Sequence, residues 1–368
     1  MRRILYIGGF ELPDKNAAAQ RVIANGKLLR KMGFCVNFIG VTRETKKQNF
    51  QFEDFSCVSI PYPINTKEWI HHAMTFVTSN TIASYDPEYV ILYNFPAIAS
   101  LKIIRYCHRN GIKIIHDTTE WEQSRGFNLR NIYKRIDTWA RMRYCIKKMD
   151  GVIAISRYLY DYYKSNVSTI LVPPLVDIID LKWNRNRKLI SEARIKIVYA
   201  GSAGSKIKDR LDYIINAIAQ FNSMDLVVVG ITKEQYILDF GELPNNSRNI
   251  VFMGRVSHQE AVRIICDSDF QMLIRDNTLK NKAGFPTKFV ESISCCTPVI
   301  ATPVSNICDY LIEGKNGYIV RNNLHLVNVL EKVAKLSIEA RIDMKKYCLD
   351  NNKFDYHYFE NEFLKLFT

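Results

Sequence analysis

The stretch Lys196-Ile197-Val198-Tyr199-Ala200-Gly201 has the composition of a buried strand that ends in a glycine turn. Near the N-terminus, Arg3-Ile4-Leu5-Tyr6-Ile7-Gly8-Gly9 has the same design. A helical pattern follows each stretch, and strands and helices then alternate in both halves of the chain. Alternation at these lengths indicates parallel strands joined by crossover helices on both faces of a sheet. The sequence therefore predicts an α/β fold in which a second doubly wound unit follows the first.

The expected elements extend over most of the chain. In the first half we expect strands at 3–7, 35–41, 55–60, 89–93, 112–116, 151–156 and 169–172, with helices at 18–32, 66–84 and 97–109. In the second half we expect strands at 196–199, 225–229, 249–253, 270–274 and 299–301, with helices at 211–221, 259–267 and 288–295. A chain of 368 residues exceeds what one hydrophobic core usually organises. We therefore expect two Rossmann-like domains, at 1–185 and 190–350, that face each other across a ligand cleft.

The composition is typical of a soluble globular protein, with 47% hydrophobic and 24% charged residues. The longest apolar runs are strand-sized, whereas a helix needs about 20 apolar residues to cross a bilayer. The N-terminus fits a strand better than a signal peptide, because its apolar stretch ends at once in Gly8-Gly9. We therefore expect a cytoplasmic protein.

Nine cysteines are scattered along the chain without a C-x-x-C pair and without histidines at metal-ligand spacing. In a cytoplasmic chain such cysteines are usually small buried apolar residues, and we expect Cys295-Cys296 to pack in the core. We expect no metal site built by protein ligands alone.

The net charge of +14 suits an anionic partner, such as nucleic acid, an anionic membrane or a phosphorylated substrate. Residues 101–150 hold twelve Lys or Arg against five Asp or Glu, about half of the excess. A basic helical pattern at 125–148 can lie on an anionic bilayer, at the inner face of the membrane, or its apolar stripe can pack on the domain core. The basic residues are Arg130, Lys134, Arg135, Arg141, Arg143, Lys147 and Lys148, and the stripe is Ile132, Ile136, Trp139, Met142 and Ile146.

Two loops of the second half could hold a nucleotide. In 199–209, the small residues Gly201 and Ser202 would let backbone N–H groups approach an anion, and Lys208 would add a positive charge ahead of a helix. In 252–256, Gly254 and Val256 at the end of a strand would seat a planar base against the backbone. Each loop, taken alone, is also compatible with an ordinary turn between a strand and a helix.

The strongest signal is Gly284-Phe285-Pro286-Thr287-Lys288-Phe289-Val290-Glu291-Ser292, followed by Thr297-Pro298-Val299-Ile300-Ala301-Thr302. The first segment places free amides at a helix N-terminus, where the helix dipole favours a diphosphate. Glu291 lies one turn into the helix between apolar neighbours, and its burial is costly unless a partner donates hydrogen bonds to it. A ribose diol would do so, and a structural ion pair is the alternative.

Together these segments resemble the family 4 glycosyltransferases, which are retaining enzymes of the GT-B fold. The resemblance spans the chain, and the ordered set of motifs is more specific than any one of them. It implies that a C-terminal helix, 354–368, crosses back to the first domain. The motifs are Gly8-Gly9, Pro173-Pro174, Gly201 with Lys208, Gly254 with Val256, the Glu291 segment with Pro298-Val299-Ile300-Ala301, and Phe354-Asp355-Tyr356.

The resemblance implies roles for individual positions. Lys208 matches the lysine that holds the donor diphosphate, Val256 the residue whose backbone meets the base, and Glu291 the acid that holds the ribose. Two positions depart from the family pattern: Ser202 stands where an arginine is expected, and Ala283 stands where the first acid of the Glu-x7-Glu motif is expected. A branch of the family with a Pro-x-Lys-x-x-Glu-like segment also lacks that acid, and residues 286–291 look like that branch.

We expect the first half to supply the acceptor site. Asp117 and Glu120 follow an expected strand, so they are candidates to orient or deprotonate an acceptor hydroxyl, whereas His116 is more simply a packed strand residue. Lys208 is the third catalytic candidate, since it would offset charge on the leaving phosphate. Arg21 could face the diphosphate or form a surface ion pair. The donor-binding candidates are Gly9, Arg21, Gly201, Ser202, Lys208, Gly254, Val256, Phe285, Pro286, Thr287, Lys288 and Glu291.

We therefore expect an enzyme that moves a sugar from a nucleotide-diphosphate sugar to a hydroxyl of a glycan or lipid-linked acceptor, without a cofactor, in surface polysaccharide or glycolipid assembly. The resemblance alone implies retention of the anomeric configuration. A catalytically silent sugar-nucleotide-binding protein is an alternative because of Ala283. A GT-B epimerase or phosphorylase would share the fold. A nucleic-acid binder is disfavoured, because aromatic residues do not interleave with the basic surface as stacking platforms.

Overall fold

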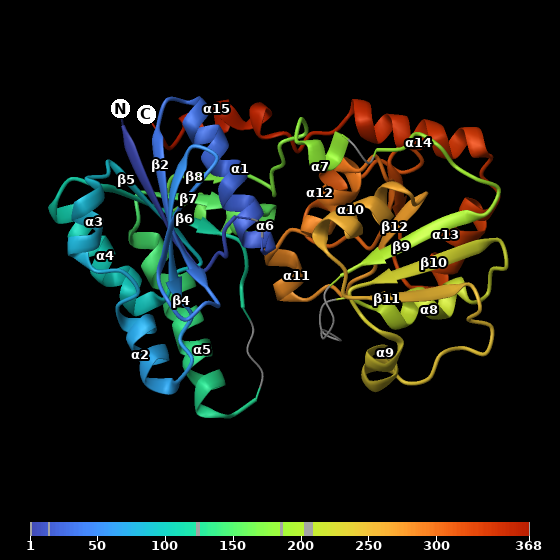
Figure 1. Ribbon diagram of the computed structural model, residues 1–368, viewed down its shortest axis with the longest axis horizontal. Coiled ribbons are helices and arrows are strands. Elements are labelled where there is room, and N and C mark those ends of the chain that lie inside the picture. The colour runs from blue at the N-terminus through green and yellow to red at the C-terminus, as the bar shows by residue number, and fades with distance from the viewer. Residues whose placement is uncertain (1, 14, 123–125, 185–186, 202–208, 368) are drawn as a thin grey trace. The chain divides into compact units, whose positions relative to one another are not determined.

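The computed structural model describes residues 2–13, 15–122, 126–184, 187–201 and 209–367 (Figure 1). The chain forms two compact units. The first unit comprises Met1–Val176, Lys282–Phe285 and Tyr356–Thr368, and the second comprises Asp177–Asn281 and Pro286–Asp355. The sequence places these limits at 1–185 and 190–350, so the structure moves the segment from Asp177 onward into the second unit.

The first unit is built on an eight-stranded sheet with the order β3-β4-β2-β1-β5-β6-β7-β8. Its neighbouring strands pair in parallel, apart from β3 and β4, which form an antiparallel hairpin at one edge. The strands are β1 (Arg3–Gly8), β2 (Cys35–Thr42), β3 (Gln48–Phe52), β4 (Phe55–Pro61), β5 (Tyr89–Tyr93), β6 (Lys113–Thr118), β7 (Gly151–Ala154) and β8 (Thr169–Leu171). The helices are α1 (Ala17–Lys31), α2 (Thr66–Met74), α3 (Ser79–Tyr85), α4 (Ala97–Arg109), α5 (Leu129–Ala140), α6 (Arg157–Tyr163) and α15 (Glu360–Leu364).

The second unit is built on a six-stranded sheet with the order β11-β10-β9-β12-β13-β14, and its strands pair in parallel. The strands are β9 (Ile195–Ala200), β10 (Met224–Val229), β11 (Ile250–Gly254), β12 (Phe270–Leu273), β13 (Val299–Ala301) and β14 (Gly317–Ile319). The helices are α7 (Leu181–Asn184), α8 (Leu211–Ile218), α9 (Lys233–Phe240), α10 (His258–Cys266), α11 (Leu279–Ala283), α12 (Thr287–Ser294), α13 (Asn323–Ala334) and α14 (Ile338–Asp350).

Helices cover both faces of the first sheet because successive side chains of each strand point to opposite faces. Ile4 of β1 belongs to the same core cluster as Val22 of α1. The next residue, Leu5, belongs to a second cluster with Ile103 of α4. A parallel strand that is buried on both faces in this way is the signature of a doubly wound sheet. The predicted α/β fold is therefore confirmed.

In the first unit one local prediction is wrong and one strand was not predicted. The expected helix at 66–84 is two helices, because the Thr78 side chain accepts the N–H of Thr81 and begins α3 anew. Strand β3 was not predicted, since its alternating polar and aromatic residues contain no apolar run.

Within the basic segment, residues 129–148 form a helix in three parts. Helix α5 continues into a π-helical turn, Arg141–Cys145, and then into a 3-10 turn, Ile146–Lys148. Its expected apolar stripe divides: Met142 and Ile146 are fully buried, whereas Ile136 and Trp139 are 61% and 59% exposed. The packing prediction therefore holds for Met142 and Ile146, whereas contact of this segment with a bilayer stays a prediction.

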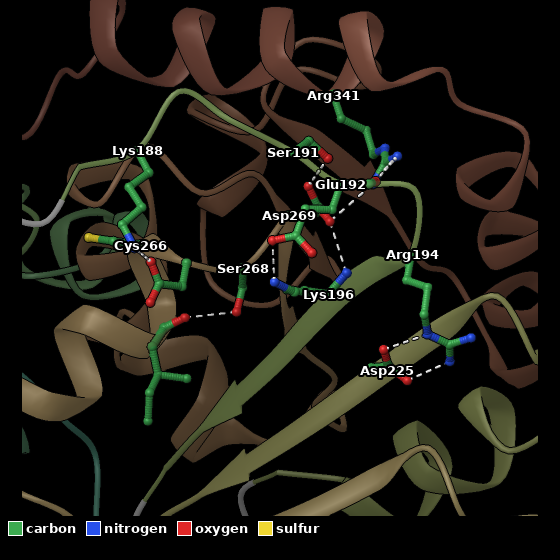
Figure 2. Close-up of polar contacts among 12 residues, drawn as sticks. Lys188, Ser191, Glu192, Arg194, Lys196, Asp225, Cys266, Ser268, Asp269 and Arg341 are labelled. Carbon is green, nitrogen blue, oxygen red and sulfur yellow. Dashed lines mark hydrogen bonds and ion pairs between the residues drawn. The ribbon is translucent and has the colours of Figure 1, made fainter.

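A buried ionic cluster ties the second unit together at the amino-terminal edge of its sheet (Figure 2). Asp269 precedes β12, and its carboxylate accepts a hydrogen bond from Ser191, the backbone N–H of Lys196 at 2.8 Å and the Arg341 guanidinium of α14 at 3.1 Å. Arg341 also donates to the carbonyl of Glu192 at 2.6 Å. Asp269 and Arg341 are each 3% exposed, so this cluster holds the segment before β9, the sheet and α14 to one another.

Candidate functional site

The carboxyl ends of the second unit's strands carry the residues that the sequence singled out. Gly201 follows β9, Gly254 closes β11, and helix α12 begins at Thr287. Ligands of doubly wound sheets bind outside this edge. The motifs that are far apart in the sequence therefore meet at one edge of one sheet.

An ion-paired cluster lies at this edge, next to Gly201. The carboxylate of Asp209 lies 2.5 Å from the Lys288 Nζ of α12 and 2.5 Å from the Arg275 Nε that follows β12. It also accepts the hydroxyl proton of Tyr199 of β9 at 2.9 Å. Two cations and one anion leave the cluster with a net positive charge, which suits an anionic ligand.

The neighbours of Asp209 hold its carboxylate in the ionised state, whereas burial lowers the pKa of Lys288. Burial by itself would raise the pKa of Asp209, but Lys288 and Arg275 lower it well below its usual range. Burial, together with the Asp209 charge, raises the pKa of Tyr199 well above its usual range, so the phenol stays a donor. The Lys288 side chain keeps 16% of its surface exposed, so its ammonium group is fixed but not sealed off.

Position 201 requires glycine because the cluster leaves no space for a side chain there. A Cβ at position 201 would lie 2.2 Å from the Lys288 Nζ and 2.6 Å from the Tyr199 hydroxyl. Any side chain there would displace the ammonium group. Gly201 and Lys288 therefore depend on each other, because the ammonium group occupies the space that a side chain at position 201 would need.

Helix α12 brings the segment 284–292 next to the loop 252–256. Its cap residue is Pro286, which has no side-chain acceptor to occupy the N–H groups of the first turn. Glu291 lies one turn after Lys288, on the same side of the helix. Its carboxylate is 19% exposed and lies 3.6 Å from the His258 Nε2, at the start of α10. His258 follows Gly254-Arg255-Val256, so Glu291 and the end of β11 are neighbours.

Gly254 has the backbone geometry that a tight strand end requires. Its φ is +61°, in the left-handed region where glycine is favoured, and its carbonyl accepts the N–H of Gly230 at 2.7 Å. Val256 lies half-buried beyond it, and Ser257 caps α10 by accepting the N–H of Glu260. Thr287 is half-buried at the first position of α12, whereas Pro286 and Phe285 are buried.

Two predicted donor-binding residues lie outside the described residues. Ser202 and Lys208 belong to the segment 202–208. Phe285 lies in Lys282–Phe285, which groups with the first unit. The cradle that the structure describes therefore consists of Gly201, Gly254, Val256, Thr287, Lys288 and Glu291.

The expected roles of Arg21 and Asp117 need correction. Both side chains are buried, with exposures of 2% and 0%, and they form a bidentate ion pair with N–O distances of 2.8 to 3.0 Å. The remaining Arg21 nitrogen donates to the carbonyls of Val172 and Pro173. Asp117 also accepts the Tyr6 hydroxyl proton. Arg21 therefore does not face a diphosphate and Asp117 cannot reach an acceptor; the pair ties α1 to β6 and to the segment after β8.

Other polar groups lie at the carboxyl edge of the first sheet. Glu120 is half-buried beyond β6, and Gly9 is exposed beyond β1. His116, fully buried, contacts the Thr118 hydroxyl at 2.6 Å, and burial holds its pKa well below its usual range. A pocket of about 620 Å³ opens where β1, β2 and β4 end, and its lining includes Glu11, Arg43, Tyr62 and Glu68.

Four residues of the donor edge escaped the prediction. Tyr199 and Asp209 border the first loop, but nothing in their local pattern shows that a carboxylate will pair with Lys288. Arg275 follows β12 without a motif, and His258 looks like an ordinary first residue of a helix. Strand ends were the available signal, since Tyr199 lies near the end of β9 and the other three residues follow a strand of the same sheet or the loop after it.

The sequence of the second unit matches a known family over this same edge. Residues 194–336 match the model of the Glycosyl transferases group 1 family. This segment is therefore similar to the group 1 glycosyltransferases. The matched segment contains the six residues described above, so the family match and the charged edge coincide. No curated protein matches the chain.

Solved structures show the fold of the whole chain, which is the GT-B fold. Sucrose-phosphate synthase from Thermosynechococcus elongatus matches with a TM-score of 0.71 and 13% identity, covering 100% of this chain and 98% of that one. The lipopolysaccharide outer core galactosyltransferase WaaB matches with a TM-score of 0.66 and 17% identity, covering 99% of both chains. HepE from Anabaena, in complex with UDP and glucose, matches with a TM-score of 0.66, 12% identity and 99% coverage of both chains.

Two further properties concern membranes and metals. Within the described part of the chain, no helix has the length and apolar character needed to cross a bilayer. Among the same residues, His, Cys, Asp and Glu side chains do not gather in threes that could hold a metal ion. The nine cysteines are free, and Cys295 and Cys296 are fully buried in the core as predicted.

Proposed function

We propose that this protein is a retaining glycosyltransferase that takes a hexose from a nucleotide-diphosphate sugar bound at the edge of the second unit. The observation that carries the proposal is the meeting of Gly201, Lys288 and Glu291 at that edge. It puts a cation, the first turn of a helix and a carboxylate within one turn of α12. A cation and the amides of a helix N-terminus suit a diphosphate, and a nearby carboxylate suits the ribose hydroxyls of the same nucleotide.

Each part of the donor has a partner in the proposed complex. The diphosphate lies at the N-terminus of α12, where Thr287 and Lys288 offer amides and the ammonium group. The ribose diol donates to Glu291 in place of His258. The base lies against the backbone at Gly254 and Val256. Lys208, beyond the described residues, is proposed to add a second cation to the diphosphate.

The proposed chemistry breaks the bond between the anomeric carbon and the diphosphate oxygen and forms a bond from that carbon to an acceptor oxygen. The acceptor hydroxyl loses its proton, and the diphosphate leaves with the negative charge. Fixed cations and amides aimed at that charge stabilise the transition state. The residues of this chain supply this stabilisation, so we propose no resident cofactor. Retention of the anomeric configuration rests on the family resemblance.

The first unit is proposed to bind the acceptor, a glycan or lipid-linked glycan used in surface polysaccharide or glycolipid assembly at the cytoplasmic face of a membrane. Support comes from the pocket beside Glu11, Arg43, Tyr62 and Glu68, because carboxylates and a guanidinium can bond sugar hydroxyls while a tyrosine ring packs on a sugar face. Glu120, beyond β6, is the proposed group that orients the acceptor hydroxyl.

A screen of nucleotides and nucleotide sugars by thermal shift tests donor binding, because a specific ligand raises the melting temperature by mass action. The donor found in this way is then incubated with glycan acceptors, and the products are analysed for transferred sugar and anomeric configuration. Glu291→Gln should abolish the shift, and Glu260→Gln, on the exposed side of α10, should not. A melting temperature that no nucleotide changes would contradict the proposal.

A catalytically silent sugar-nucleotide-binding protein is the second candidate, favoured by Ala283 at the position of the family's first acid. It would show the thermal shift without transfer to any acceptor. An epimerase would convert the donor sugar in the absence of an acceptor, so product analysis without acceptor separates it from both.

A further inference from the structure

Helix α5 of the first unit turns apolar side chains toward solvent. Ile136 and Trp139 are 61% and 59% exposed, although helices normally bury such residues. Arg135, Ile136, Trp139 and Arg143 follow one another at one-, three- or four-residue steps, so they share one side of the helix. Phe127, just before the helix, is 88% exposed.

The opposite side of the helix is held by polar contacts. The Asp137 carboxylate accepts the N–H of Ala97 at the start of α4 at 2.8 Å. The Arg141 guanidinium donates to the carbonyl of Asn94 at 3.2 Å, and Thr138 is buried. Figure 1 shows α5 beside α4. The helix is therefore fixed in an orientation that leaves its apolar residues outside.

The π-helical turn after α5 gathers positive charge on the same exposed side. A π turn takes one residue more than an α turn, and one residue corresponds to about 100° around a helix. Met142 and Ile146 consequently rotate into the core, where they are fully buried. Tyr144 and Lys147 rotate outward instead, toward the side that carries Ile136 and Trp139, and both are exposed.

The charge of this surface has one sign. Residues 126–149 contain seven Lys or Arg and a single acidic residue, Asp137. Asp137 points inward to Ala97 and is paired with Arg141 at 3.7 Å. No carboxylate of this segment therefore offsets the exposed cations. Arg135 lies 5.6 Å from the ring of Phe127, and Lys148 lies 4.5 Å from the ring of Tyr144, so the aromatic and basic groups are interspersed.

We propose that this face, formed by Phe127, Arg135, Ile136, Trp139, Arg143 and Tyr144 and called the α5 face, binds the surface of an anionic lipid bilayer. The helix lies in the plane of the interface, with Ile136 and the aromatic rings among the acyl-chain ends and the basic groups at lipid phosphates. Trp and Tyr favour that depth because one end of each ring system is apolar and the other is polar. A second copy of the chain would oppose like charges across the same face.

Vesicle co-sedimentation tests the proposal with the full chain. The probes are vesicles of phosphatidylcholine alone and of phosphatidylcholine with about a third phosphatidylglycerol. We expect binding to the anionic vesicles that weakens as salt is raised, and much weaker binding to the neutral ones. Lipids brominated on the acyl chain should quench the fluorescence of Trp139, and Trp139→Phe should remove that quenching while retaining binding.

Two pairs of substitutions separate the apolar and basic contributions. Ile136→Ser with Trp139→Ser should lower the vesicle partition coefficient at least about 10-fold. Arg135→Glu with Arg143→Glu should lower it about 30-fold, from about 1 kcal/mol for each basic residue near the surface. The matched controls lie on exposed positions of the second unit: Leu238→Ser with Leu324→Ser, and Lys233→Glu with Lys332→Glu. Thermal melts verify that each variant is folded.

Three results would overturn the proposal. These are equal binding by the α5-face variants and their controls, absence of binding to anionic vesicles, and loss of vesicle binding on adding short RNA at near-physiological salt. A concentration-dependent dimer that the apolar pair dissociates would assign the face to a second copy instead. Vesicle binding does not depend on catalysis, so each of these outcomes leaves the proposed transfer reaction standing.

Discussion

In the proposed donor site Lys288 supplies a positive charge for the diphosphate, and Asp209 holds its ammonium group in place. The ammonium group lies 2.5 Å from the carboxylate and 4.5 Å from the centre of the Tyr199 ring. Its position is therefore fixed before any ligand arrives, so little side-chain entropy remains to be lost on binding. Arg275 balances the same carboxylate from the other side.

Lys288→Ala should weaken binding of the nucleotide-sugar donor about 10- to 100-fold, because a charge-assisted hydrogen bond to a phosphate contributes about 1.5–3 kcal/mol. Calorimetric titration with the donor found in the thermal-shift screen measures this. Lys233→Ala, on exposed α9, is the control. Lys208→Ala should also weaken donor binding in this titration, and its turnover should fall about 100-fold. Unchanged affinity in Lys288→Ala would remove that residue from the donor site.

The Asp209 carboxylate should make stability depend on acid. Its pKa in the folded protein lies below the unfolded value, near 4. Such a group stabilises the fold at pH values above the unfolded pKa, and this contribution is lost as the pH falls toward the folded pKa. The difference in unfolding free energy between wild type and Asp209→Asn should therefore be constant near neutral pH and shrink below about pH 4. Urea titrations at several pH values measure it, and a constant difference down to pH 3 would speak against the ion pair.

Asp117→Asn should destabilise the first unit by about 3–5 kcal/mol, because the buried Arg21 charge would lose its partner. Denaturant unfolding followed by circular dichroism measures the change. The molecules that remain folded should keep the donor affinity of wild type, since Asp117 is buried away from any ligand. If stability stayed at the wild-type level while transfer activity disappeared, a catalytic role for Asp117 would have to be restored.

Helix α12 and the sheet of the second unit show how elements divide the work. The carboxyl edge of the sheet carries the proposed donor site, with Gly201, Lys288 and Glu291, and the amino edge carries the Asp269–Arg341 cluster (Figure 2). Both edges hold buried or half-buried charges. Their exposure differs: the first edge keeps Lys288 partly exposed, whereas the second buries Asp269 and Arg341 against each other.

A pair of substitutions at the two edges should give opposite results. Gly201→Ala places a methyl group 2.2 Å from the Lys288 ammonium and should lower donor affinity about 10-fold or more, with a modest effect on stability. Arg341→Met leaves Asp269 with an uncompensated buried charge and should cost about 3–5 kcal/mol of stability, with donor affinity retained in the folded fraction. Unfolding curves and donor titrations on both variants measure this, and equal loss of affinity in both would contradict the division.

Sequence patterns predicted elements where periodicity was strong. The apolar strands and the glycine turns gave the fold class, and the motif around Glu291 gave the helix that carries the cradle. Arg21 and Asp117 were misjudged because a local pattern does not reveal a partner 96 residues away. The stripe at 125–148 was divided by a π turn, which a pattern based on 3.6 residues per turn cannot contain. Asp209 and Arg275 were not predicted, because their pairing depends on the spatial proximity of segments that are far apart in the sequence.

At the scale of the whole molecule, each unit has its own sheet and its own hydrophobic core. The proposed donor site lies in the second unit, and the proposed acceptor and membrane surfaces lie in the first. Substitutions that test one proposed site can therefore be confined to one unit, and the residues of the other unit stay unchanged.

Calorimetric melting should show two transitions, one for each unit, and a donor nucleotide sugar should raise the one that belongs to the second unit. At a ligand concentration about 100 times Kd, the expected stabilisation is about 2.7 kcal/mol. Arg341→Met identifies that transition, because it lowers the melting temperature of the second unit. A single transition that shifts as a whole would show that the two units unfold together.

The antiparallel hairpin at the edge of the first sheet has a consequence for how the protein behaves in concentrated solution. Strand β3 is short, its outer residues Gln48, Asn49 and Gln51 are exposed, and Lys46 and Lys47 precede it. Without it, the apolar strand β4 would present an open row of backbone donors and acceptors to other molecules. Such a row can pair with a strand of another molecule. The polar residues of β3 and the lysines before it disfavour this pairing. The hairpin therefore limits aggregation through strand pairing between molecules. Shortening it should lower solubility and leave the proposed donor site unchanged.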